Sequence, residues 1–320
     1  MKENNKITRD IKAFRRRIKM SPKRVWVLVE GKTHDRTFYE NILERTLDLP
    51  SSRFEVRLSE QVSADGVAAG GKPHVIKLFN IMRENDWLEQ ENRRGKVSTI
   101  FFLDKDVDDF QSKTISDPHV IYTKNADVEA EIFHYCDLNQ AISISHGIGK
   151  GPSGRVLAGS ETVPERLAAH WENWIRLRLL AIACEFSGSA RFGQPSHLHE
   201  ASFGKLIPDT EEEIRDNIRR SCASEETWLA ANDRVDEFIA ELKSDNRFSS
   251  LVSGKHLAHY LIHLTELALK DVVVRTRITA QEVTISCFAN LNFEDDWSKY
   301  YQSKLENVLG IGIAEKEKVS

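Results

Sequence analysis

Two apolar runs constrain the fold of this chain more than any other feature. Arg24–Val29 reads RVWVLV and Ser98–Leu103 reads STIFFL, and both are rich in β-branched and aromatic residues. A strand with one face in water alternates apolar and polar residues, whereas a strand buried on both faces is apolar throughout. We therefore expect both runs to be central strands of a mostly parallel sheet with helices on both faces.

Strands and helices alternate over the first 140 residues. Further strands are expected over 53–58 and 119–122, and helices over 33–47, 73–85 and from about residue 127. Pro73 stands at the first position of the second of these helices, which suits a residue without an N–H. The alternation predicts an α/β fold, Rossmann-like with a mostly parallel sheet.

The composition changes after about residue 142. The segment SHGIGKGPSGRVLAGS is rich in glycine and is expected to be a loop, and the sequence beyond it has the spacing of helices over 162–186, 210–221, 225–243, 254–270 and 294–307. We expect three parts: a basic N-terminal helix (1–22), an α/β domain (23–150) and an all-α domain (151–320).

The bulk composition excludes several classes of protein. Hydrophobic residues make up 40% of the chain and charged residues 29%, values typical of a soluble globular protein. No apolar run is long enough to span a bilayer, and the first twenty residues lack the apolar core of a signal peptide. We expect a cytoplasmic protein with no membrane partner. The four cysteines form no CxxC motif and are expected to be free buried thiols.

The N-terminal region is strongly basic although the formal net charge of the chain is −4. Seven cations fall within a short stretch: Lys12, Arg15, Arg16, Arg17, Lys19, Lys23 and Arg24. Such a patch can bind phosphate groups. It can also be a solvated helical face, or attract the acidic remainder of another copy.

Carboxylates follow three of the expected strands. Glu30 ends the first apolar run, Asp104 and Asp106 follow the second, and Glu129 lies in TKNADVEAEIF after the last strand. The carboxyl ends of parallel strands meet at one edge of a sheet, so Glu30, Asp104 and Asp106 are expected to lie close together, with Glu129 near them. Neighbouring carboxylates repel one another unless a cation lies between them, and oxygen ligands suit Mg²⁺ or Mn²⁺. Such a site favours phosphoryl or phosphodiester chemistry.

The segments VLVEGKTHDRTFYENIL, IFFLDKDVDDF and NADVEAEIF together resemble a TOPRIM domain. This is the catalytic fold of topoisomerases, DnaG-type primases and OLD-family nucleases, and the chain is most similar to the effector subunits of PARIS anti-phage systems. The resemblance covers roughly residues 24–140. Beyond them, SGKHLAHYL (Ser253–Leu261) is the one distinctive motif.

The resemblance implies roles for the acidic residues. Glu30 would act in acid–base chemistry or bind metal, Asp104 and Asp106 would bind Mg²⁺, and Glu129 would be the downstream acidic residue. Many relatives read Glu-Gly-x-x-Asp, whereas here three residues separate Gly31 from Asp35. Asp35 is therefore in doubt as a site residue, and its place in a first helical turn is an alternative explanation.

The resemblance also implies a biological role. It points to a toxic nuclease effector in antiviral defence by abortive infection, held inactive by an ABC-type ATPase sensor and released when a phage protein is detected. The target would be nucleic acid, either RNA, with host tRNA a leading candidate, or DNA. A homodimer is common among TOPRIM nucleases.

Three lysines are candidates for substrate binding. Lys72 ends a glycine-rich loop before a helix, where a phosphate can bind. Lys105 stands between the two aspartates, and Lys255 lies in the SGKH turn. For Lys72 the alternative is a solvated loop lysine, and for Lys105 it is a side chain that points away from the metal.

Two other functions compete with the nuclease. In a HAD-type phosphatase, an aspartate directly after an apolar strand is the nucleophile, and FFLDKDVDD looks like that motif. That motif usually lies near the start of a chain, and the phosphatase has no use for the Glu-Gly strand. The other alternative is a TOPRIM-shaped regulatory or binding subunit with a degenerate site.

Overall fold

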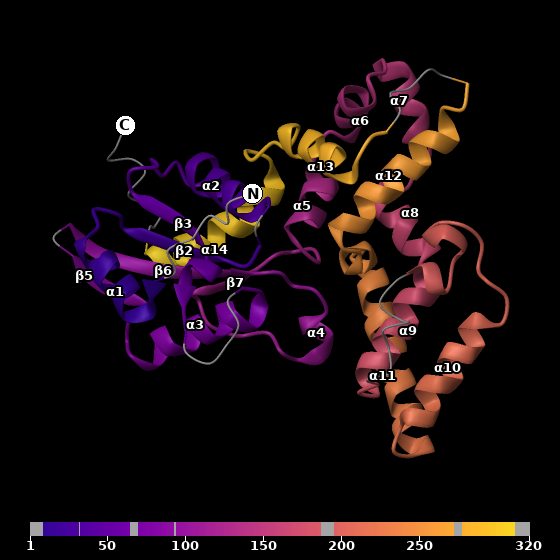
Figure 1. Cartoon of the computed structure of the whole chain (residues 1–320), viewed down its shortest axis with the longest axis horizontal. Helices are drawn as coiled ribbons and strands as arrows, with labels where there is room; N and C mark the ends of the chain where they lie inside the picture. Colours follow the sequence, from indigo (N-terminus) through magenta and orange to yellow (C-terminus); the bar gives the residue numbers. More distant parts are fainter. Residues whose placement is uncertain are drawn as a thin grey trace, which may run out of the picture. The chain divides into compact units, whose positions relative to one another are not determined.

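A computed structural model describes residues 9–31, 33–64, 70–92, 94–186, 195–271 and 277–310 (Figure 1). The first residues of the expected basic helix and most of the loop before Lys72 lie outside this part of the chain. The described residues form two compact units. Unit 1 takes its residues from Met1–Asp104, Ile115–Thr123 and Asn292–Ser320, and unit 2 takes them from Lys105–Thr114 and Lys124–Leu291.

Unit 1 is built on a mixed five-stranded sheet. Its strands are β2 (Val25–Val29), β3 (Phe54–Leu58), β5 (Glu89–Asn92), β6 (Gly95–Leu103) and β7 (Val120–Tyr122). β2 lies between β3 and β6 and is parallel to both, and β6 also pairs with β7 in parallel and with β5 in antiparallel orientation. Every residue of β2 is buried, as the apolar run predicts for a central strand. A separate short pair joins β1 (Arg9–Asp10) to β4 (Val62–Ser63).

Helices cover both faces of this sheet. On one face, α1 (Ile11–Met20) places Phe14 edge-on to Trp26, and α3 (Lys72–Glu84) places Phe79 against Phe101. On the other face, Tyr39 stacks on Phe102 with ring centroids 3.8 Å apart. Three elements supply this second layer: α2 (Asp35–Asn41), its π-helical continuation η1 (Ile42–Thr46) and α14 (Lys299–Leu309). Short 3-10 turns η2 (Ser59–Gln61) and η6 (Asp296–Ser298) complete the unit.

Unit 2 is helical. Its helices are α4 (Asp108–Gln111), α5 (Val128–Tyr135), α6 (Leu138–His146), α7 (Lys150–Val156), α8 (Val163–His170), α9 (Glu172–Ala183), α10 (Thr210–Ser221), α11 (Glu225–Ser244), α12 (Gly254–Ala268) and α13 (Ala280–Ala289), with 3-10 turns η3 (Pro195–His197), η4 (Glu200–Ser202) and η5 (Phe248–Leu251). The long helix α12 packs against α5, α7, α8 and α13, while α9 packs against α10 and α11 (Figure 1).

Several elements differ from those expected. The helix expected over 162–186 is two helices, α8 and α9, which meet at Trp171. The indole of Trp171 is fully buried, stacks on Phe203, and donates from Nε1 to the carbonyl of Ser202 at 2.8 Å. The tertiary contact of this ring therefore outweighs the local helical pattern. The glycine-rich segment expected as a loop contains α7, and neither β5 nor α13 was expected.

The two units also divide the chain differently from the boundaries expected near residues 22 and 150. Helix α1 packs on the sheet as part of unit 1, whereas α5, α6 and α7 belong to unit 2. Helix α14, expected in the all-α domain, belongs to the sheet unit because Tyr301 packs on Phe38 and Phe102. Within the described ranges, no helix is both long enough and apolar enough to cross a membrane.

Candidate functional site

The carboxyl edge of the unit 1 sheet brings together Glu30 and Asp104. Glu30 directly follows β2, and Asp104 directly follows the neighbouring parallel strand β6. The register pairs Leu28 with Phe101, so its continuation places Glu30 opposite Leu103, beside Asp104. Neighbouring strands lie about 4.8 Å apart, so the backbones of Glu30 and Asp104 are neighbours at this edge, and the binding of one cation by both carboxylates stays a prediction. One oxygen of Glu30, Oε2, is shielded from solvent.

The turn after Glu30 is shaped by a contact between a glycine and an aspartate. Asp35, the first residue of α2, is only 5% exposed, and its Oδ2 accepts a hydrogen bond of 2.7 Å from the N–H of Gly31. A Cβ atom at Gly31 would lie 2.3 Å from Oδ1 of Asp35, so any larger residue here would require the Asp35 carboxylate to move. Asp35 thus belongs to the edge of the sheet that carries Glu30, and it also lies in a first helical turn. The extra residue after Gly31 does not remove it from this region.

Two further groups of unit 1 lie at helix starts on this edge. His34 precedes α2, and burial lowers the pKa of its imidazole, which is therefore neutral at pH 7. Lys72 is the first residue of α3, after Gly71, whose φ is 74°. Nε2 of His74, in the first turn of α3, lies 3.2 Å from the carbonyl oxygen of Ser59, which directly follows the parallel strand β3, so the start of α3 lies at the carboxyl end of the sheet. A lysine at such a position adds positive charge where the helix dipole already favours anions.

Asp106 is fixed within unit 2, two residues after Asp104 along the chain. Its backbone has a φ of 48°, in the left-handed region that aspartate adopts more readily than most residues. Its N–H donates to the carbonyl of Ala126 at 2.9 Å, which fastens the turn to the segment before α5. Two peptide units span at most about 7 Å, so covalent geometry alone keeps Asp106 close to Asp104.

Lys105 forms an ion pair with an aspartate of its own turn. Its Nζ lies 2.5 Å from Oδ2 of Asp109, and the same oxygen lies 3.8 Å from Nη2 of Arg247. The positive charge of Lys105 is thus compensated by Asp109. Its role in binding substrate stays a prediction.

The acidic residues around the start of α5 divide by function. Asp127 is the N-cap of α5 and accepts from the N–H of Ala130 at 2.7 Å. Glu131 is fully buried and accepts from the N–H groups of Lys124 and Asn125. These two carboxylates therefore hold backbone in place. Glu129 lies half-buried in the first turn of the same helix, and its expected role as a metal ligand stays a prediction.

Asp127 also fastens the SGKH motif to α5. Its side chain accepts from Ser253 Oγ and from the N–H of Gly254 at 3.0 Å. Burial raises the pKa of Asp127, whereas these hydrogen bonds act in the opposite direction. A Cβ atom on Gly254 would lie 2.2 Å from the carbonyl carbon of Glu129, so the two helix starts touch through their backbones. The first half of the motif is therefore structural, a role that its sequence did not reveal.

The second half of the motif carries the charged residues. Lys255 is exposed on the first turn of α12. The neighbouring His256 packs edge-on to Trp171, with ring centroids 5.0 Å apart. Burial, together with the charges of Lys255 and Arg178, lowers the pKa of His256 to about 4. The imidazole is therefore neutral at pH 7, and Lys255 is the cation that this turn offers to a ligand.

The donor chemistry at the sheet edge fits Mg²⁺. Glu30 and Asp104 offer hard carboxylate oxygens, with Asp106 held close by the chain. Among the described residues, no three histidine, cysteine or acidic side chains converge into a complete set of metal ligands. Mg²⁺ is commonly bound by one or two carboxylates, with water and substrate phosphates completing its shell, so an acidic pair is sufficient.

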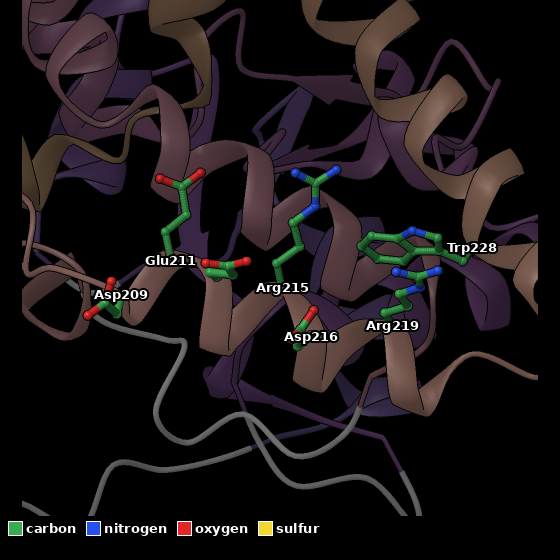
Figure 2. Close-up of a pocket in the computed structure, with 7 residues that line it drawn as sticks. Asp209, Glu211, Arg215, Asp216, Arg219 and Trp228 are labelled. Atoms are coloured by element: carbon green, nitrogen blue, oxygen red, sulfur yellow. The ribbon is translucent and has the colours of Figure 1, made fainter.

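Apart from the sheet edge in unit 1, unit 2 has a cleft that is lined by both acidic and basic side chains. It has a volume of about 460 Å³, and Figure 2 shows its side chains along α10 with Trp228 of α11 at one end. Arg215 lies 5.8 Å from the centroid of the Trp228 ring. Four carboxylates and two arginines line this cleft: Asp209, Glu211, Glu212, Asp216, Arg215 and Arg219. The carboxylates outnumber the arginines, so the lining carries a net negative charge and offers no site for an anionic substrate.

Comparison with known proteins adds no relative to these observations. The chain matches no model of a known protein family, and no curated protein is similar enough to be recognised as a relative.

Proposed function

We propose that this protein is a Mg²⁺-dependent nuclease of the TOPRIM type. The observation that carries the proposal is the pair Glu30 and Asp104, which follow two neighbouring parallel strands at the edge where α/β sheets bind ligands. The start of α3 at the same edge adds a favourable position for an anion, whereas the start of α2 already carries the carboxylate of Asp35. A phosphodiester is a substrate whose cleavage uses both a divalent cation and such an anion-binding group.

Roles for the individual residues follow from these positions. Glu30, Asp104 and Asp106 would hold the cation, which when bound offsets the negative charge of the scissile phosphate and activates water. A carboxylate oxygen of Glu30 accepts the proton of the attacking water, as a general base does. Lys72 attracts the phosphate backbone from the start of α3. Glu129, Lys105 and Lys255, all in unit 2, are assigned to metal or substrate binding by the resemblance alone.

We place this nuclease in the cytoplasm as a toxic effector of anti-phage defence. It would be released by an ABC-type ATPase sensor and would cut nucleic acid, with host tRNA as the leading target and DNA as the other. These assignments, and a homodimeric state, follow from the resemblance to TOPRIM effectors of PARIS systems. A degenerate regulatory subunit and a HAD-type phosphatase are the two alternatives that the experiment below separates.

A cleavage assay tests the proposal. Purified protein is incubated with total cellular RNA or plasmid DNA in Mg²⁺, Mn²⁺ or EDTA, beside Glu30→Ala and Asp104→Ala. We expect metal-dependent cuts that both variants lose by at least 100-fold, as is typical when a catalytic or charge-stabilising group is removed. Cleavage that persists in both variants would contradict the assignment. An aspartyl-phosphate trapped on Asp104 would support the phosphatase instead.

A further inference from the structure

A cationic cleft on unit 1 lies on helix α1, and the nuclease mechanism makes no use of it. It has a volume of about 420 Å³. Its lining consists of four cations and one indole, with no carboxylate among them: Lys12, Arg15, Arg16, Lys19 and Trp87. The contrast with the chain as a whole, whose formal charge is −4, marks this lining as a local concentration of positive charge.

The cleft is held in place by the opposite face of α1. Ile11, Phe14 and Ile18 are buried in the core of unit 1. The end of the helix is fastened as well, because the side-chain amide of Asn92 donates to the carbonyl of Ser21 at 2.9 Å. Helix α1 therefore packs on the sheet through its apolar face. Its cations are held at defined positions on the surface of unit 1.

Arg15 and Trp87, which both line the cleft, stack on each other. The guanidinium carbon of Arg15 lies 4.4 Å from the centroid of the indole ring, and Nε of Arg15 is shielded from solvent. This stacking holds the planar guanidinium, whose fork of N–H groups matches the oxygens of a phosphate. Trp87 itself packs against the core of unit 1.

Among the described residues, the four cations of the cleft have no acidic side chain paired with them; the carboxylate of Asp10 lies nearby but accepts from the backbone N–H of Lys12 at 3.3 Å. None of them forms an ion pair with any residue in the described ranges, whereas Arg17 on another side of the same helix pairs with Glu55 at 3.4 Å. The spacing of Lys12 to Arg16, and of Arg15 to Lys19, is four residues, so like charges face each other on one helix. Like charges at this spacing repel each other, and an anion bound in the cleft would relieve the repulsion.

We propose that this cleft binds the phosphodiester backbone of nucleic acid. The eight residues from Lys12 to Lys19 rise about 10 Å along the helix, the length of about three steps between successive phosphates of one strand. A nucleic-acid strand carries a negative phosphate at every nucleotide, so its charges repeat regularly along such a row of cations. An acidic protein has no such built-in repeat and would need carboxylates placed at the same positions. The inference rests on the proposed function and extends it, because it gives the nuclease a docking surface apart from Glu30 and Asp104.

Binding is measured by fluorescence anisotropy with a labelled 20-nucleotide RNA and the matching single-stranded DNA. All reactions contain EDTA, so binding is observed whether or not the protein is a nuclease. The test variant is Arg16→Glu/Lys19→Glu, which reverses two exposed charges of the cleft. The matched control, Arg219→Glu/Arg220→Glu on α10 of unit 2, changes the net charge by the same amount. Arg16→Gln/Lys19→Gln provides a milder version, and circular dichroism checks that each variant is folded.

We expect Arg16→Glu/Lys19→Glu to bind at least tenfold more weakly than the wild type, and the control to bind within twofold of it. The slope of log K against log salt for the wild type should exceed that of the glutamine variant by about 1.4, the value for two phosphate contacts on a single strand. Equal affinities of the test and control variants would overturn the inference. If both variants lost affinity to the same extent, the loss would reflect the net charge of the protein rather than this cleft, and this too would overturn the inference.

Discussion

Two glycines lie against two aspartates, one pair in each unit, and the contacts are alike in chemistry but different in reach. In unit 1, Asp35 accepts from the N–H of Gly31, four residues earlier. In unit 2, Asp127 accepts from the N–H of Gly254, which is 127 residues later. The local contact shapes the turn that carries Glu30, whereas the distant one joins the starts of α5 and α12. The same interaction therefore serves a candidate site in one unit and tertiary structure in the other.

The close approach at Gly254 gives the largest expected effect on stability. A Cβ atom there would lie 2.2 Å from the carbonyl carbon of Glu129 and 2.3 Å from the N atom of Ala130, and backbone cannot move aside as a side chain can. We expect Gly254→Ala to lower the free energy of unfolding by about 3 kcal/mol, measured by urea denaturation. Gly154→Ala in α7 is the matched control, because its Cβ would meet no atom within 4 Å. Equal stabilities of the two variants would show that the helix starts do not touch.

The carboxylate of Asp127 is expected to have the next largest effect. It accepts from the N–H groups of Ala130 and Gly254 and from Ser253 Oγ. Asp127→Ala leaves these donors without an acceptor and should cost about 2 kcal/mol. Asp127→Asn keeps one acceptor oxygen and should cost clearly less. Thermal unfolding of the two variants checks this order, and the reverse order would contradict the role of Asp127 as an acceptor.

Acid should weaken unit 2 through its buried histidines. Burial lowers the pKa of His134, and likewise that of His256, to about 4. The unfolded state, with pKa values near 6.5, binds more protons than the folded state between pH 6.5 and 4, so stability falls as the pH drops through this window. At pH 5.5, His134 should contribute about 1 kcal/mol of this loss. Urea denaturation at pH 7.5 and 5.5 should show a smaller difference for His134→Gln, and an unchanged difference would refute the assignment.

The local contact at Gly31 should have the smallest effect on stability. Its Cβ would meet the carboxylate end of Asp35, 2.3 Å away, and this side chain can rotate. We expect Gly31→Ala to cost about 1 kcal/mol, yet to lower metal-dependent cleavage by tenfold or more because the turn that carries Glu30 shifts. Gly31→Ala/Asp35→Ala removes the clash and should recover part of the stability. If Gly31→Ala lost as much stability as Gly254→Ala, the claim that the Gly31 contact yields more easily would be wrong.

The comparison also shows what the sequence reveals and what it hides. The apolar runs predict β2 and the end of β6, and the rule for parallel strands then places Glu30 and Asp104 at one edge. These predictions succeed because a short, continuous apolar run is a local pattern that indicates a buried strand. By contrast, β5 reads EQEN and has no apolar signal, because it is an edge strand that pairs through its backbone.

Contacts between distant segments account for the remaining differences. Nothing near Asp127 indicates that its partner is Gly254, and nothing near Trp171 indicates that its indole is buried against Phe203. Helix α14 has an ordinary amphipathic pattern, and its place on the sheet is decided by aromatic rings that lie more than 190 residues away. Such pairings depend on the complementarity of two surfaces, and a single local pattern does not contain that information.

The central claim is that Glu30 and Asp104 hold a divalent cation, and Mn²⁺ binding followed by electron paramagnetic resonance tests it most directly. The titration compares the wild type with Glu30→Gln and Asp104→Asn, and with Asp86→Asn, which alters an exposed acid of the same unit. We predict one Mn²⁺ site in the wild type and in Asp86→Asn, and an affinity at least tenfold weaker in the other two variants. Equal Mn²⁺ affinity in all four proteins would contradict the claim.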